Sequence, residues 1–289
     1  MRSAATTTIE RFWEIKEIED EETIAEDDYC LKKRFVVRLP FAEDRGLGES
    51  YKRAMARFLS LEKRLEGCPK LKAEYRKTVD ELITINHMVK VDERKPGKYY
   101  IPHQAVIRET SLTAKVRVVF DASSKTPNGK SLNDIMHTGP KLQKDLLDII
   151  TKWRTWRFVI SADVEKIFRQ INIDEEDQEY QYVLWRNNKS EPVQQFKLTT
   201  VTYGTASASF LAVRTLIEIA NRCENQDIAK RIKEDFYMDN LLIGANSKLE
   251  CMEVQEKIAQ QLEMYGFHLR KWIANSSDIL RAANWAEEN

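Results

Sequence analysis

The sequence is poor in the residues that build metal clusters and disulfide frameworks. Only four cysteines and four histidines occur among its 289 residues. Cys30, Cys68, Cys223 and Cys251 lie far apart and form no zinc-binding spacing with the histidines. A structural zinc site is therefore not indicated, and we expect the cysteines to be reduced thiols.

Two further features are missing, a membrane-spanning run and a secretion signal. No apolar stretch reaches the roughly 20 residues that a helix needs to cross a bilayer. The N-terminal region lacks the apolar core of a signal peptide. We therefore expect a protein that is not secreted, has no membrane partner and works inside the cell, in the cytoplasm. The Asn-x-Ser triplets at Asn188 and Asn275 are then incidental.

What the sequence does contain is charge, unevenly distributed. Acidic and basic side chains number 46 each. Residues 1–30 carry a net charge of −7, residues 31–158 of +13 and residues 159–289 of −6. A basic block of this size is typical of a protein that binds a polyanion, and an acidic block can hold cations. Charge alone leaves open the alternative of two ordinary solvated faces.

Hydrophobic periodicity predicts a mixture of helices and antiparallel strands. Helices are predicted over residues 51–66, 71–83, 141–153, 207–223 and 249–266. Strands are predicted over residues 34–40, 98–107, 114–123, 156–164, 179–187 and 193–201. This order predicts an α+β fold, an antiparallel sheet backed by helices, with Asp163 and Asp239 at the ends of candidate neighbouring strands.

The stretch FYMDNLLIGA, residues 236–245, is predicted to form a hairpin with Asp239 and Asn240 in its turn. A polar turn explains this stretch without any function. Alternatively, Asp163 and Asp239 together form a carboxylate pair of the kind that holds Mg²⁺ for nucleotide transfer. Spacing alone does not distinguish these interpretations.

The chain resembles a known family in five stretches that occur in the same order. They are KVRVVFDASSK (115–125), SADVEKIFRQI (161–171), VTYGTASASF (201–210), FYMDNLLIGA (236–245) and GFHLRKWIANS (266–276). Together they resemble the reverse transcriptase domain of retrotransposon polyproteins, specifically that of the BEL/Pao group. The resemblance runs from about residue 11 to about residue 285, and VVFDAS, SLND, YGTAS and LRKW are specific to that group.

The resemblance implies a right-hand polymerase with fingers and palm. It implies an acidic extension over 1–49, fingers over 50–135 and 172–199, palm over 136–171 and 200–275, and a tail over 276–289. The thumb is expected to be largely absent, and no RNase H, protease or integrase region is expected, as in a fragment of a longer element. The implied activity is RNA-directed DNA synthesis, a nucleotidyl transfer with Mg²⁺ or, alternatively, Mn²⁺. The implied partners are a primed RNA or DNA template and dNTPs, and an intact element would place the domain in a particle.

The resemblance also implies a metal site. Asp163 and Asp239 match the metal carboxylates, and the backbone carbonyl of Val164 matches a further ligand. Asn240 occupies the position of a third carboxylate. Lys271 resembles a palm lysine thought to protonate pyrophosphate.

Five further residues match positions that contact the nucleotide. Lys115 and Arg117 match the cations of the fingers that grip the triphosphate, and the fork of an arginine suits phosphate oxygens. Phe168 matches the aromatic residue that excludes a ribose 2′-hydroxyl, with a core aromatic as the alternative. Tyr203 and Gly204 match a segment lying against nucleotide and template, where glycine permits close approach.

Two positions depart from the family pattern. Asn240 keeps a carbonyl oxygen but lacks the charge of the aspartate it replaces, and Ser209 stands where proline is usual at a helix start. Two functions therefore remain open. One is a polymerase domain impaired by Asn240 and the missing thumb. The other is a non-catalytic, nucleic-acid-binding remnant or co-opted protein that keeps the fold.

Overall fold

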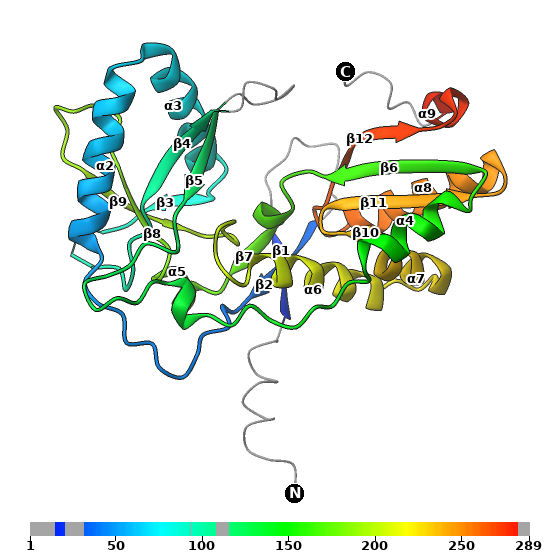
Figure 1. Ribbon diagram of the computed structural model, residues 1–289, viewed down its shortest axis with the longest axis horizontal. Coiled ribbons are helices and arrows are strands. Elements are labelled where there is room, and N and C mark those ends of the chain that lie inside the picture. The colour runs from blue at the N-terminus through cyan, green and yellow to red at the C-terminus, as the bar shows by residue number, and fades with distance from the viewer. Residues whose placement is uncertain (1–14, 21–31, 93, 108–115, 283–289) are drawn as a thin grey trace, which may run out of the picture. The chain divides into compact units, whose positions relative to one another are not determined.

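The computed structural model describes residues 15–20, 32–92, 94–107 and 116–282 (Figure 1). Its helices are α2 (Tyr51–Glu66), α3 (Pro69–Thr84), α4 (Leu146–Arg154), α5 (Glu175–Gln178), α6 (Ala208–Asn221), α7 (Gln226–Glu234), α8 (Lys248–Glu263) and α9 (Ser277–Ala282). Its strands are β1 (Ile15–Asp20), β2 (Lys32–Val37), β3 (Met88–Lys90), β4 (His103–Ile107), β5 (Val116–Phe120), β6 (Phe158–Val164), β7 (Ile171–Ile173), β8 (Tyr182–Trp185), β9 (Gln194–Leu198), β10 (Phe236–Tyr237), β11 (Asn240–Ala245) and β12 (Leu269–Ala274). Among these residues, no helix has the length and apolar character needed to cross a membrane. The predicted triphosphate contact Lys115 lies outside the described residues, as do residues 1–14 and 283–289.

The chain folds into two compact units, each built from separate stretches of sequence. Among the described residues, unit 1 contains 37–92, 94–107, 116–139 and 172–208. Unit 2 contains 15–20, 32–36, 140–171 and 209–282. Unit 2 carries both aspartates of the predicted metal site.

Unit 2 is built on an antiparallel sheet in the order β10-β11-β6-β12. Side chains along the central strand β6 alternate in burial, because successive residues of a strand point to opposite faces. Ile160, Ala162 and Val164 are buried, whereas Ser161 and Asp163 on the opposite face are partly accessible. Helices α4, α7 and α8 pack against these strands (Figure 1). The core of unit 2 therefore fixes β6 from one face and leaves Asp163 on the other.

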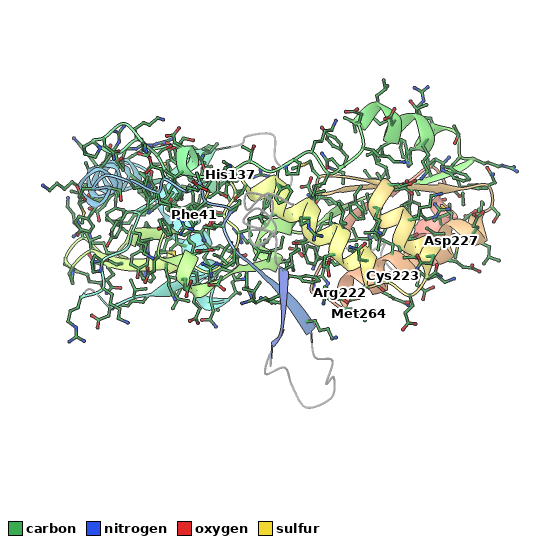
Figure 2. The ribbon with its side chains drawn as sticks, turned by 90° about the horizontal axis from the view of Figure 1, so that it is seen from below. Phe41, His137, Arg222, Cys223, Asp227 and Met264 are labelled. Atoms are coloured by element: carbon green, nitrogen blue, oxygen red, sulfur yellow. The ribbon has the colours of Figure 1, made fainter. Side chains whose placement is uncertain are left out.

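Strand β2 is anchored where α6 and α8 end. Phe35 is fully buried and stacks on Tyr265 with ring centroids 5.0 Å apart. The guanidinium carbon of Arg222 lies 5.0 Å from the centre of the Phe35 ring, and the Lys33 N–H donates to the Met264 carbonyl at 3.2 Å. Figure 2 shows Arg222 and Met264 close together at this end of unit 2. These contacts attach β2 to the helices of unit 2.

Unit 1 packs α2 and α3 against the hairpin β4–β5 and the sheet β3-β9-β8. A buried histidine, His103 on β4, joins three of these elements. Its Nδ1 lies 2.5 Å from the hydroxyl of Tyr75 on α3, and its Nε2 lies 2.9 Å from the carbonyl of Leu184 on β8. Burial lowers the pKa of His103. The neutral ring therefore donates to Leu184 and accepts from Tyr75, which satisfies both of its nitrogens.

The α+β pattern predicted from the sequence is confirmed, but some elements differ. Helix α7 was not predicted; its short apolar stripe contains Ile228 and Ile232, and its cap is the Asn225 side chain, which accepts from two backbone N–H groups. Strand β1 was not predicted either. Helix α6 begins at Ala208 with Ser209 exposed in its first turn, so the helix forms without the proline usual there.

Helix α4 begins at Leu146, five residues later than predicted. Asp145 precedes it with an extended backbone, at a ψ of 141°. The preceding segment instead places the side-chain carbonyl of Gln143 3.0 Å from the backbone nitrogen of Met238. This contact ties the segment to the hairpin that carries Asp239.

A largely buried ion pair between α2 and the residue after β8 gives a test of the packing in unit 1. Arg186 donates to both carboxylate oxygens of Glu62 at 2.8 and 2.7 Å, with side chains 13% and 14% exposed. The hydrogen bond from Arg186 holds the pKa of Glu62 below its ordinary value. The carboxylate therefore stabilises the fold fully above its unfolded pKa of about 4.3, and the stabilisation is lost as pH falls through the lower folded pKa.

We predict that Glu62→Gln lowers the free energy of unfolding by about 2 kcal/mol at pH 7. The difference in free energy of unfolding between Glu62→Gln and the unaltered protein should become smaller as pH falls below about 4. Urea unfolding of both proteins from pH 7 to pH 3 measures it. Glu66→Gln is the control, because Glu66 lies 3.4 Å from an exposed Lys189. Equal losses in both variants, or a loss that does not change with pH, would contradict the prediction.

Candidate active site

The hairpin β10–β11 has a two-residue turn. Tyr237 pairs with Asn240, so Met238 and Asp239 form the turn and Asn240 is the first residue of β11. The prediction that Asn240 lies in the turn is therefore wrong by one position. Met238 has a φ of 56°, in the left-handed region that side chains rarely adopt. Its N–H is bonded by Gln143, which helps to hold the turn in this register.

The pairing of β11 with β6 brings Asp163 and Asp239 to the same end of the sheet. Asn240 is the cross-strand partner of Asp163, and the N–H of Val164 donates to the carbonyl of Asp239 at 2.8 Å. Partial burial raises the pKa of Asp239, and the negative charge of Asp163 raises it further. The two carboxylates therefore repel one another. The side-chain amide of Asn240 donates to the Asp239 carboxylate at 3.0 Å.

Lys271 reaches this end of the sheet from the other neighbour of β6. Arg270 on β12 is the cross-strand partner of Asp163, and the register then shifts before Ile273. Within this irregularity Lys271 has a φ of 55°. Bulges of this kind re-aim side chains, and the ammonium of Lys271 lies 3.3 Å from Asp163 Oδ2. The positive charge of Lys271 lowers the pKa of Asp239, which offsets part of the repulsion.

The donor set at this sheet end fits a hard divalent cation. Asp163 and Asp239 offer carboxylate oxygens, and Asn240 offers an uncharged amide oxygen. Mg²⁺ prefers such oxygens and completes its octahedron with water and substrate phosphates. Over the ranges that the structure describes, no cluster of three or more His, Cys, Asp or Glu side chains has the arrangement of a metal site. The set is thus two carboxylates, and the role of the Val164 carbonyl stays a prediction.

Phe168 lies just beyond β6 in the short 3-10 helix Ile167–Gln170. The turn starts after Lys166, whose φ is 47°. Ile167 is buried, whereas Phe168 is only half-buried. Phe168 is therefore not fully buried, and its contact with a nucleotide stays a prediction.

The remaining predicted contacts belong to unit 1. Arg117 is exposed on β5, opposite Val106. Tyr203 is half-buried with its ring edge-on to Phe120 at 6.0 Å, and Gly204 is exposed with a φ of 98°. A Cβ on Gly204 would lie 2.6 Å from the carbonyl oxygen of Phe120, so glycine is required by both space and conformation.

Two residues near the aspartates escaped the sequence interpretation. Gln143 bonds the hairpin turn, and Arg270 pairs with Glu165, two residues after Asp163. The position of Arg270 within the LRKW motif is the one sequence signal that could have marked Arg270 as part of the site. Gln143 lies in a segment with a helical pattern, which hid its contact with the hairpin.

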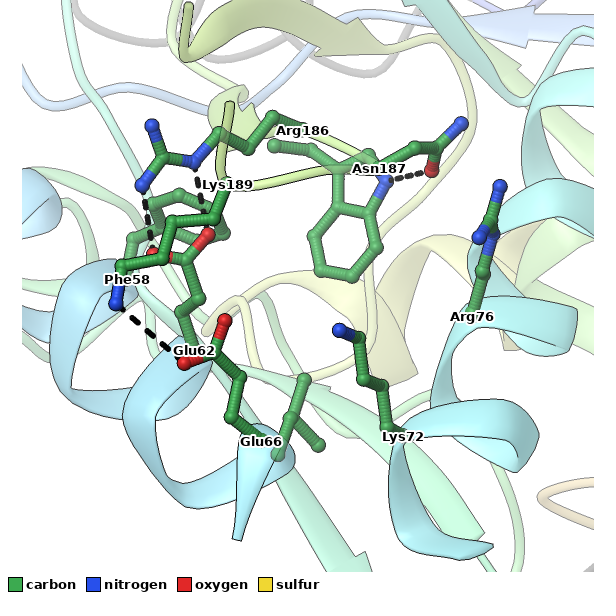
Figure 3. Close-up of a pocket in the computed structure, with 10 residues that line it drawn as sticks. Phe58, Glu62, Glu66, Lys72, Arg76, Arg186, Asn187 and Lys189 are labelled. Atoms are coloured by element: carbon green, nitrogen blue, oxygen red, sulfur yellow. Dashed lines mark hydrogen bonds and ion pairs between the residues drawn. The ribbon is translucent and has the colours of Figure 1, made fainter. Parts of the chain in front are cut away.

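A pocket in unit 1 is not a substrate site. It lies between α2, α3 and the end of β8, lined by Glu62, Lys72, Trp185 and Arg186 among others (Figure 3). Its free volume is about 20 Å³, which accommodates roughly one water molecule. We take the sheet end in unit 2 as the candidate active site because the strand pairing there brings Asp163 and Asp239 together.

Comparisons with known proteins agree with this geometry. A family model described as reverse transcriptase (RNA-dependent DNA polymerase) matches residues 103–271. No curated protein matches by sequence.

Three similar solved structures are foamy virus proteins. One is the foamy viral protease–reverse transcriptase with RNA/DNA hybrid (15% identity, TM-score 0.55), covering 70% of this chain and 24% of that chain. Another is a foamy viral protease–reverse transcriptase with double-stranded DNA, at 16% sequence identity and a TM-score of 0.53. This match covers 69% of this chain and 30% of that chain. The third is a mutant prototype foamy virus protease–reverse transcriptase, at 14% sequence identity and a TM-score of 0.53. This match covers 70% of this chain and 23% of that chain. The chain thus spans less than a third of the length of these relatives, and the likeness shows the palm-and-fingers fold.

The contact between Lys271 and Asp163 gives a test of the candidate metal site. An ammonium beside a carboxylate competes with a divalent cation for it. We predict that Lys271→Met binds Mn²⁺ about two- to fivefold more tightly than the unaltered protein, the range expected for a partly exposed ion pair. Titration followed by the electron paramagnetic resonance of free Mn²⁺ measures the affinity.

Lys248→Met is the matched control, because Lys248 pairs with Asp278 elsewhere in unit 2. Asp163→Asn should weaken binding. Mn²⁺ affinity that is unchanged in Lys271→Met, or raised equally in Lys248→Met, would contradict the assignment.

Proposed function

The chain belongs to the reverse transcriptase family, and from this premise we propose that it is the polymerase domain of a BEL/Pao-type retrotransposon. In this proposal it transfers deoxynucleotides to a primer 3′-hydroxyl under the direction of an RNA or DNA template. The supporting observation is the pair Asp163 and Asp239, held at one end of an antiparallel sheet and close enough to shift the pKa of Asp239. The SLND and LRKW motifs support the BEL/Pao assignment.

Each residue of the sheet end has a part in this proposal. Asp163 and Asp239, with the Val164 carbonyl, would hold Mg²⁺ or Mn²⁺. The bound metal supplies activation of the primer hydroxyl and neutralisation of the triphosphate. Lys271 pairs with Asp163 at 3.3 Å and, in this proposal, would give a proton to the departing pyrophosphate. The half-buried ring of Phe168 would lie under the sugar and exclude a 2′-hydroxyl.

We propose that unit 2 forms most of the palm and that unit 1 contains the fingers together with 136–139 and 200–208, which the resemblance assigns to the palm. As the resemblance implies, Arg117 and Lys115 would contact the triphosphate, and Tyr203 and Gly204 would contact the nucleotide. The foamy virus relatives are described with double-stranded DNA and with RNA/DNA hybrid. The excess of basic residues in 31–158 supports the same class of partner for this chain, because phosphate contacts dominate nucleic-acid affinity.

One observation favours a second function, nucleic-acid binding without catalysis. Asn240 is exposed and lies directly opposite Asp163, where an aspartate would add a third negative charge. Its amide N–H donates to Asp239 and so occupies a lone pair of Oδ1 that could otherwise bind a metal. A protein that keeps the fold and the basic residues but not this charge would still bind a template.

A direct test compares the unaltered chain with Asn240→Asp. An attraction between unit charges about 4 Å apart is on the order of 4 kcal/mol at an effective dielectric of ~20. Recovery of roughly half of that in the transition state would speed addition by more than tenfold. We therefore predict at least a tenfold gain for Asn240→Asp in single-nucleotide addition on primed poly-rA with Mg²⁺, and a smaller gain with Mn²⁺.

Asp163→Asn serves as the inactive control in the same assay. Equal, robust addition by the unaltered chain and Asn240→Asp would show that the third charge is dispensable. Absence of addition in both, with template binding retained, would favour the non-catalytic function.

The position of Phe168 predicts sugar selection. Phe168→Val should increase the use of rNTP relative to dNTP by about tenfold or more, since a steric clash with the 2′-hydroxyl is removed. Phe168→Tyr keeps the bulk and should retain discrimination. The ratio of kcat/KM for dTTP and UTP measures the effect, and an unchanged ratio in Phe168→Val would exclude this role.

A further inference from the structure

The motif SLND, residues 131–134, has no part in the site described so far. We propose that Asn133 is a positioning residue that holds the Tyr203–Gly204 turn in one conformation and thereby sets the affinity for the incoming nucleotide. The first half of this statement concerns the fold of unit 1 alone. The second half rests on the proposed function.

Asn133 hydrogen-bonds neighbouring segments through both the nitrogen and the oxygen of its side-chain amide. Its Nδ2 donates to the carbonyl of Gly204 at 2.9 Å and to the hydroxyl of Ser123 at 2.8 Å. Its Oδ1 accepts from the N–H of Ala206 at 2.8 Å. The amide thus bonds the chain on both sides of Thr205. Only an amide side chain offers two donors and an acceptor in this arrangement.

The rest of the motif fixes Asn133 itself. Asn133 begins the 3-10 helix that ends at Ile135, and its N–H donates to the carbonyl of Ala122 at 3.1 Å. Asp134 accepts from the N–H and the hydroxyl of Ser131 at 2.7 and 2.6 Å. The side chain that bonds the turn therefore projects from a segment that is itself closed by hydrogen bonds.

The Tyr203–Gly204 turn depends on hydrogen bonds for a fixed conformation. Gly204 is exposed, adopts a φ of 98° and has no side chain to pack. Glycine has more conformational freedom to lose than any other residue. Below the turn, Thr205 bonds the carbonyl of Thr202 through its N–H at 3.2 Å and its hydroxyl at 2.7 Å. Asn133 adds the bonds to Gly204 and Ala206, so the exposed part of the turn is held as well as its base.

Three variants test the proposal. Asn133→Ala removes all three side-chain bonds. Asn133→Asp keeps an acceptor for Ala206 but loses the donors to Gly204 and Ser123. Asn128→Ala is the matched control, because Asn128 lies in the same loop and bonds Gly46 and Thr126 instead.

Hydrogen exchange of the backbone amides over 201–207 reports on the turn without requiring activity. Asn133→Ala should speed exchange there by about tenfold, the effect of losing one to two hydrogen bonds. Asn133→Asp keeps the acceptor for Ala206 but sets a carboxylate oxygen against the Gly204 carbonyl, so it too should speed exchange, and only over the same residues. Asn128→Ala should leave these amides unchanged. Unchanged exchange in Asn133→Ala would overturn the proposal, as would exchange that rises throughout unit 1 in both Asn133 variants.

Nucleotide affinity is read separately, with a dideoxy-terminated primer on poly-rA so that no turnover is needed. The apparent Kd for the next dNTP should rise about fivefold or more in Asn133→Ala, while the Kd for primer–template and the melting temperature match those of Asn128→Ala. In the Asn240→Asp protein the same change should raise KM and leave kcat within about twofold. An unchanged dNTP affinity despite faster exchange would overturn the nucleotide role. If the unaltered chain does not bind dNTP, the proposed function is overturned instead. The exchange data would then still test whether Asn133 holds the Tyr203–Gly204 turn.

Discussion

Two like charges held at the end of one strand pair are the constraint on which the candidate site depends. Pairing of β11 with β6 sets Asp239 beside Asp163, and burial of the Asp239 carboxyl makes the repulsion between them costly. The alternation along β6 makes this possible, because Ile160, Ala162 and Val164 anchor the strand in the core. The functional face is thus held by the buried face of the same strand.

The structure balances this repulsion by local means. Lys271, which has a left-handed backbone conformation in the irregular part of β12, places its ammonium beside Asp163. Asn240 donates a side-chain N–H to Asp239. Both contacts stabilise negative charge that a metal would otherwise neutralise. Left-handed residues cost of order 1–3 kcal/mol when they carry a side chain, and they concentrate at functional sites. Met238, in the turn that precedes β11, and Lys271, in β12, flank the two aspartates in this way.

The sequence predicted the class of the fold and the elements with strong periodicity. Helix α2 spans the residues that the apolar spacing of Tyr51 to Leu65 predicts, and β6 ends close to Asp163 as expected. The errors have a common physical origin in contacts between distant residues. Gln143 bonds Met238 across 95 positions of sequence, so no local pattern could have placed the turn at Met238–Asp239. The bonds from Asn133 to Gly204 and Ala206 likewise join segments that only the folded chain brings together.

The central claim is that Asp163 and Asp239 together hold the metal of a polymerase site. Anomalous diffraction from crystals of the chain grown with Mn²⁺, primer–template and a dNTP analogue that resists transfer tests it most directly. We expect an anomalous peak within about 2.5 Å of a carboxylate oxygen of each aspartate, with the ammonium of Lys271 displaced from Asp163. A peak that touches neither aspartate, in crystals where the nucleotide is bound, would contradict it.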